Sequence, residues 1–180
     1  MANAPSEKCV ELPYHCPVCG VKLAAEADTL RYDAACRGCR SLLWCRRRTV
    51  GDVVVLDVIP GRTPEHGEVA RVAESLVRLG GPPRVVVDLS RFELISSAFV
   101  AALVVLNRAT QRAKGKLVLC GMRRFVRDTF VRTKLDTVIE VSDDEETARA
   151  SLQSAQLTSP SLAAANGPDP AQSPTSSAGL

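Results

Sequence analysis

The chain has 180 residues, of which 46% are hydrophobic and 24% are charged, and its formal net charge at pH 7 is +3. This length and apolar content suit one ordinary domain plus a smaller appendage. The nearly balanced charge gives no overall argument for nucleic acid or for an anionic membrane surface. The longest apolar run, residues 98–106, is too short to span a bilayer, and residues 1–8 lack the apolar core of a signal peptide. We therefore expect a cytoplasmic protein without membrane contact.

The first part of the chain has the cysteine spacing of a metal site. Residues 1–8 are expected to be flexible, and residues 9–48 hold six of the seven cysteines, including two C-x2-C pairs separated by sixteen residues. Both thiolates of such a pair can reach one ion, and two pairs complete the tetrahedral four-sulfur shell that zinc accepts. The sequence predicts a β zinc ribbon with structural Zn²⁺. Its ligands are Cys16, Cys19, Cys36 and Cys39.

The alternative for these cysteines is a set of unligated thiols or a redox pair. If all four are ligands, the site is closed and not hydrolytic, because a hydrolytic zinc keeps one position open. Cys9, His15 and Cys45 are near enough in sequence to be further ligands, but each is expected to be a packed or surface residue.

Residues 49–152 alternate strand-like and helix-like patterns. Apolar runs predict strands near residues 42–50, 53–59, 84–89, 116–120 and 137–141. Helical spacing with glycine or proline stops predicts helices near residues 67–79, 97–114, 123–133 and 143–152. The first two strands are expected to form a hairpin across Gly51 and Asp52. This order predicts an α/β fold with a small, mostly parallel sheet flanked by helices.

Residues 153–180 differ in composition from the rest of the chain. Serine, alanine, proline and glycine dominate, and Asp169 is the single charged residue. The segment lacks a periodic apolar face whose burial could offset the entropy of ordering it. We expect a disordered tail.

The middle segment assembles no catalytic group in sequence. It has no nucleotide-binding glycine pattern, its one histidine is His66, and Cys120 ends a strand with no visible base nearby. Basic residues collect between 123 and 134, where a solvated helix face explains them as well as an anion or partner site does. The prediction is a non-enzymatic protein, and an enzyme or small-ligand carrier is the weaker option.

Several features of residues 50–152 occur together: the Pro60-Gly61-Arg62 turn, the strand ending at Asp88, the KGKLVL strand entry and the DDEETA ending. With these features and spacings, the segment resembles the STAS domain, the module shared by anti-sigma factor antagonists, stressosome proteins and the tails of sulfate transporters. The resemblance implies an STAS-type sheet of four or five strands flanked by helices, here at residues 49–152. It also implies binding in partner-switching signalling or transcription control.

The resemblance gives the start of the helix expected at residue 97 a specific role. In the family's antagonists this helix start docks on an anti-sigma factor, and a serine there is phosphorylated by that partner. The family motif is Asp-Ser-(Ser, Thr or Ala)-Gly-Leu. Here Ser97 matches the phosphoacceptor, Ser96 replaces the aspartate and Phe99 replaces the glycine. The motif is degenerate, so Ser97 is either a phosphorylation candidate or only the N-cap of a buried helix. Candidate partner-binding residues are Asp88, Ser96, Ser97 and Phe99.

Two functions stay open at this point. The favoured one is an anti-sigma factor antagonist-like protein that binds an anti-sigma factor, a serine-kinase-like regulator or another STAS protein. The alternative is a nucleic-acid-binding zinc-ribbon protein that uses its STAS domain for dimerisation or recruitment. The basic run Arg46 to Arg48 motivates it, although on a strand Arg47 points away from the other two arginines.

Overall fold

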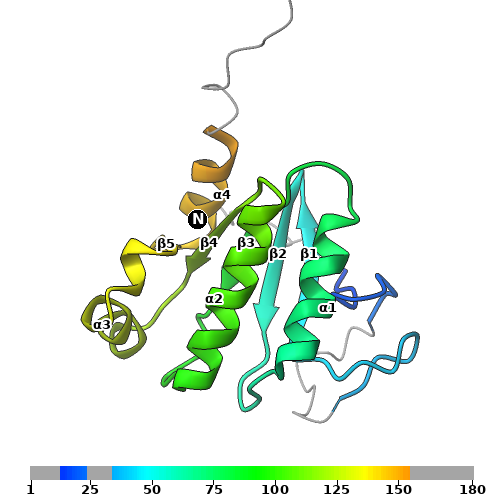
Figure 1. Ribbon diagram of the computed structural model, residues 1–180, viewed down its shortest axis with the longest axis horizontal. Coiled ribbons are helices and arrows are strands. Elements are labelled where there is room, and N and C mark those ends of the chain that lie inside the picture. The colour runs from blue at the N-terminus through cyan, green and yellow to red at the C-terminus, as the bar shows by residue number, and fades with distance from the viewer. Residues whose placement is uncertain (1–12, 24–33, 155–180) are drawn as a thin grey trace, which may run out of the picture.

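A computed structural model describes residues 13–23 and 34–154 of the chain (Figure 1). The flexible start expected at residues 1–8 and nearly all of the tail expected at residues 153–180 lie outside these ranges. The described part is a five-stranded sheet with helices on both faces. The α/β prediction is therefore confirmed.

The strands of the sheet follow the order β1-β2-β3-β4-β5. They are β1 (Cys45–Val50), β2 (Val53–Val58), β3 (Arg84–Asp88), β4 (Lys116–Cys120) and β5 (Glu140–Val141). β1 and β2 pair antiparallel as the predicted hairpin, and the later neighbours pair parallel. β5 is shorter than predicted, because Leu135–Thr137 turns as a 3₁₀ helix, η2, before pairing begins.

The helices of the described residues occupy both faces of this sheet. They are α1 (His66–Val77), α2 (Ser97–Arg112), α3 (Arg124–Arg132) and α4 (Glu145–Ser154). α1 and α2 lie side by side over one face (Figure 1), and α4 packs on β3 and β4.

Alternating strand residues separate two apolar cores. Leu56, Val87 and Leu119 belong to the larger core, which α1, α2 and α3 cover. Val86 and Val118 belong to a smaller core that α4 covers with its apolar side chains. A strand that is covered on both faces needs apolar residues at nearly every position. This two-sided burial explains the continuous apolar runs that were read as strands.

An ion-pair network ties α4 to the hairpin on the side of the smaller core. Arg48 donates from Nε to Asp57 Oδ2 over 2.9 Å and from Nη1 to Glu145 Oε1 over 2.9 Å. The side chains of Arg48 and Asp57 are only 17% and 8% exposed. Burial lowers the pKa of Arg48, but its hydrogen bonds to Glu145 and Asp57 outweigh that effect and raise it. The guanidinium therefore stays charged between its two carboxylates.

The cysteine-bearing segments pack directly on the edge of the sheet. His15 and Arg47 of β1 exchange two backbone hydrogen bonds of 2.7 and 2.9 Å, which form an antiparallel bridge. The Ser75 hydroxyl of α1 donates to the buried carbonyl of Pro17. Figure 1 shows both segments beside β1 and α1. The ribbon region and the sheet are therefore one packed unit.

Candidate metal centre and helix docking site

The four cysteines of the predicted ligand set lie on two turns with matching geometry. In the first turn the Gly20 amide donates to the Cys16 carbonyl over 3.0 Å, and in the second the Arg40 amide donates to the Cys36 carbonyl over 2.9 Å. Gly20 and Arg40 both have left-handed backbone angles, with φ of 77° and 61°. Each turn thus folds back at the same place and aims its two thiols at the other turn.

The four thiols converge on one point. Their Sγ atoms all lie within 4.8 Å of one another, with Cys16 and Cys39 3.7 Å apart and Cys19 and Cys36 3.6 Å apart. Sulfurs that bind one zinc tetrahedrally at about 2.3 Å are separated by about 3.8 Å. The observed spacing therefore fits a single metal ion.

The thiols of the cluster differ in the direction of their pKa shifts. Burial raises the pKa of the Cys16 thiol to about 12. For Cys39, burial raises the pKa, but hydrogen bonds from the side chain and backbone of Ser41 outweigh it and lower the pKa to about 6. Thiolates are the metal-binding form, and a bound cation holds them deprotonated. These four cysteines can hold a metal ion.

The other nearby candidates are not part of this cluster. Cys45 is fully buried at the start of β1, where burial raises the pKa of its thiol well above the usual value. His15 is held by its backbone pairing to Arg47 and to Lys22. Cys9 lies outside the described residues. Among the described residues, the cysteines that cluster are the four that the spacing singled out.

The second candidate site is the start of α2. The N-cap of this helix is Ser96, whose Oγ accepts a hydrogen bond from the Phe99 amide over 3.1 Å. Its Oγ also lies 3.3 Å from the Thr63 hydroxyl in the loop before α1. Capping by Ser97 is therefore wrong, because Ser96 is the last residue with extended backbone angles and Ser97 is the first helical one. Ser97 is exposed.

Replacing Ser96 with alanine is expected to lower the free energy of unfolding by about 1 kcal/mol, because an orphan amide of the first turn loses its acceptor. Ser97→Ala is the matched control and should cost less than about 0.5 kcal/mol, as expected of an exposed position away from the cap. Urea unfolding of both variants measures the difference. Equal costs would contradict the assignment of the cap.

Phe99 does not face a partner, contrary to the expectation from the motif. Its side chain is 2% exposed and lies edge-on to Trp44, with ring centroids 6.4 Å apart, and tilted against Phe92 at 5.1 Å. Phe99 occupies the third helical position, which faces the larger core. The ring therefore fills the interior.

Asp88, the remaining candidate, shapes the loop that follows β3. It is half-buried, and its Oδ1 accepts a hydrogen bond from the Ser90 amide over 2.8 Å. A Cβ at Gly121 would lie 2.7 Å from the same oxygen, and Gly121 has a φ of +69°. Position 121 therefore favours glycine, because a side chain there would clash with the Asp88 carboxylate where β3 and β4 end.

Two exposed apolar residues near this helix start were not identified from the sequence. Leu94 is 76% exposed in the loop before α2, and Phe125 is 74% exposed in the first turn of α3. An ion pair of 2.7 Å between Glu93 and Arg123 joins these two segments. Large apolar side chains that are exposed close together mark interaction surfaces. The sequence pattern of apolar residues does not distinguish such exposed side chains from those of the core.

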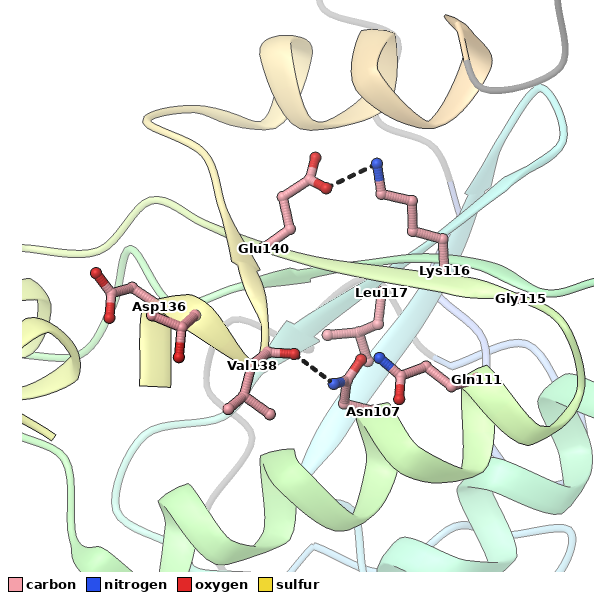
Figure 2. Close-up of a pocket in the computed structure, with 9 residues that line it drawn as sticks. Asn107, Gln111, Gly115, Lys116, Leu117, Asp136, Val138 and Glu140 are labelled. Carbon is pink, nitrogen blue, oxygen red and sulfur yellow. Dashed lines mark hydrogen bonds and ion pairs between the residues drawn. The ribbon is translucent and has the colours of Figure 1, made fainter. Parts of the chain in front are cut away.

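A further cavity of about 410 Å³ lies at the other end of α2. Figure 2 shows that Asn107 donates to the Val138 carbonyl, over 3.1 Å, and that Lys116 pairs with Glu140, over 2.7 Å. The lining also includes Gln111. The lining of this cavity is therefore more polar than that of a lipid-binding pocket.

The sequence model of the STAS domain family matches residues 42–148. BtrV of Bordetella bronchiseptica, whose name gives it provisionally as an anti-sigma factor antagonist, is 32% identical over 75 residues, 42% of this chain and 65% of that protein. The alignment thus spans less than two thirds of the relative.

Solved structures share the fold. The NMR structure of the Thermotoga maritima protein TM1081 matches with a TM-score of 0.54 and 20% identity, covering 59% of this chain and 86% of that one. An anti-sigma-factor antagonist (STAS) domain protein from Planctomyces limnophilus matches with a TM-score of 0.50 and 19% identity, covering 61% and 97%. None of the helices within residues 34–154 combines the length and the hydropathy of a membrane span.

Proposed function

The chain belongs to the STAS domain family, and we propose that it docks on its partner through the start of α2, around Ser97, in a partner-switching signalling or transcription-control system. The family match and the relative's name support a non-enzymatic, anti-sigma factor antagonist-like protein. The observation that carries the proposal is that Ser97 is exposed at the first position of α2, while Ser96 alone supplies the cap.

The geometry around Ser97 suits a docking surface whose partner affinity is controlled by phosphorylation. The Ser97 hydroxyl takes part in none of the side-chain hydrogen bonds found among the described residues, so a kinase could reach it. A helix N-terminus tolerates an anion, whereas an interface that fits a neutral hydroxyl does not tolerate about two added negative charges. Phosphorylation of Ser97 would therefore leave the fold intact and weaken docking.

The partner that fits this surface is an anti-sigma factor, a serine-kinase-like regulator or another STAS protein. Leu94 and Phe125 supply exposed apolar groups on the two segments that the Glu93–Arg123 ion pair joins. Apolar anchors surrounded by polar groups are the usual composition of a binding surface. Ser96 provides no carboxylate, so any kinase must orient the Ser97 hydroxyl with its own groups.

Ser97→Glu is expected to weaken partner binding by at least about tenfold, or ~1.4 kcal/mol, because it places a negative charge in the docking surface. Ser97→Ala should bind like the wild type. Ser154→Glu, which adds the same charge at an exposed position of α4, is the matched control. The measurement is a titration of the partner captured from the source cells. Capture without any anti-sigma factor, kinase-like regulator or STAS protein would contradict the proposal, as would unchanged affinity of Ser97→Glu.

The proposed metal is structural Zn²⁺. Four thiolate ligands form a closed shell, which favours a structural over a catalytic ion. The donor set of Cys16, Cys19, Cys36 and Cys39 is all sulfur, a set that zinc accepts in tetrahedral geometry. When bound, the ion would crosslink the two turns.

The three consecutive arginines that motivate the nucleic-acid alternative do not form an exposed basic patch. Arg46 is 3% exposed and lies over the Tyr14 ring, with its guanidinium carbon 3.8 Å from the ring centroid. Arg48 is engaged by Asp57 and Glu145. Of the three consecutive arginines, Arg47 alone is neither buried nor in this network. The run therefore does not offer the clustered charge that phosphate binding requires.

A further inference from the structure

We infer that Trp44 and Phe99 are positioning residues that make the conformation of the α2 start depend on the metal in the four-cysteine site. The inference rests on the proposed docking role of the α2 start. It deepens that role by giving the docking surface a regulator inside the same chain.

The first step of the argument is the short connection from the metal ligands to Trp44. Cys39 is the last ligand, and the chain then runs through Leu43, whose amide donates to the Ala34 carbonyl over 2.8 Å. The next residue, Trp44, accepts at its carbonyl from the Ile59 amide over 2.9 Å. The second turn of the metal site and the end of β2 therefore fix the backbone of Trp44 from two sides.

The second step is the contact between Trp44 and the α2 start. Trp44 is 2% exposed, and its ring meets Phe99 at an interplanar angle of 79°. The Phe99 amide donates the capping hydrogen bond to Ser96. A shift of the indole therefore acts on the residue that closes the first turn of α2, two positions from Ser97.

The third step concerns what holds Trp44 in place. Its Nε1 is buried and has no hydrogen-bond partner among the described residues. Packing alone, without a directional bond, sets the orientation of the indole. Such a side chain can reorient when its neighbours loosen, and the preceding residue, Leu43, belongs to the buried cluster that contains Cys16 and Cys36.

The fourth step is a parallel link through α1. Pro17, inside the first turn, accepts from the Ser75 hydroxyl, and Val18 packs against the larger core that contains Phe99. Metal loss would release both turns, because a segment of this size has too little apolar contact to stay folded unaided. Release of the turns would then loosen the packing of the larger core beneath the α2 start through both links.

The test compares the full chain with bound Zn²⁺ and after removal of the metal by a chelator. Trp44 is the one tryptophan of the chain, so its fluorescence reports on the first half of the connection. Hydrogen exchange of the amides of residues 96–103 reports on the second half. We expect metal removal to shift the Trp44 emission to longer wavelength and to speed exchange at Phe99 and Val100 by about tenfold or more, since local opening becomes easier.

Variants separate coupling from general loosening of the core. Phe99→Leu should keep the emission change but lose the metal dependence of exchange at residues 96–103. Phe130→Leu removes the same volume from another buried phenylalanine of this core, on α3, and should keep both responses. Trp44→Phe, which preserves an aromatic contact, should retain the metal-dependent exchange that Trp44→Leu loses.

Unchanged exchange at residues 96–103 upon metal removal would overturn the inference, whether or not the Trp44 emission changes. Loss of the metal dependence in Phe130→Leu would also overturn it, because the effect would then be general. Neither readout involves a partner protein. A failure of the proposed docking function would therefore leave the exchange result standing and would be recognised separately by the Ser97→Glu titration.

Discussion

Cys16→Ser is expected to reduce bound zinc from one ion per chain to none and to unfold the two cysteine turns, while the sheet and its helices stay folded. A serine hydroxyl is a poor replacement for a thiolate, and structural zinc sites contribute about 10–16 kcal/mol of apparent binding free energy in small domains at pH 7.

The sheet should survive this change with lower stability. The turns contribute two backbone hydrogen bonds at β1 and the buried Ser75 to Pro17 bond, each worth about 0.5–1.5 kcal/mol. Their loss should lower the free energy of unfolding by a few kcal/mol but leave both apolar cores.

Elemental analysis and urea unfolding measure the two expectations about Cys16→Ser. Cys120→Ser is the control, because Cys120 is equally buried but lies in the core under α4. It should lose stability and keep its metal. A full zinc equivalent in Cys16→Ser would refute the site.

Arg48→Leu is expected to lower the free energy of unfolding by about 3–5 kcal/mol, the usual cost of removing one partner of a buried ion pair. The substitution leaves Asp57, 8% exposed, and Glu145 facing each other without their cation. Most of the cost comes from desolvated carboxylates and not from a lost attraction.

The comparison for Arg48→Leu is Lys116→Met, which removes an ion pair with Glu140 whose side chains are 40% and 43% exposed. Exposed pairs contribute at most about 1 kcal/mol, so this variant should unfold close to the wild type. The double variant Arg48→Leu, Asp57→Leu should recover much of the loss. Equal effects of the two single variants in thermal or urea unfolding would show that the Arg48 network is not effectively buried.

The element order and the cluster of four cysteines were predictable because each has a strong local pattern. The C-x2-C spacing determines which thiols can share an ion, and the apolar runs at β3 and β4 determine where strands covered on both faces lie. The hairpin followed from Gly51 at a turn, where the observed φ is 62°.

The details of the α2 start were not predictable in the same way. A cap at Ser96 and a cap at Ser97 differ by one residue, and both serines have the same hydroxyl. The first half of the helix is apolar all round, so the pattern does not say which side Phe99 faces. Only tertiary packing against Trp44 decides that Phe99 is internal.

The packing of the first cysteine turn on β1 was also not predictable from the sequence. The His15 to Arg47 bridge is made by backbone groups, which every residue carries. Arg46 belongs to a basic run in the sequence, but its guanidinium lies over the Tyr14 ring. Long cationic side chains can cover apolar surface in this way.

The bridge at His15 also bears on aggregation. An open strand margin is a template for another chain, and here the first turn already occupies the outer side of β1 at Arg47. The opposite margin is β5, which has two residues and places the charged Glu140 at its start. A chain without the proposed metal ion would leave the longer β1 margin uncovered. The proposed ion would therefore protect newly made molecules from pairing through their sheet edges.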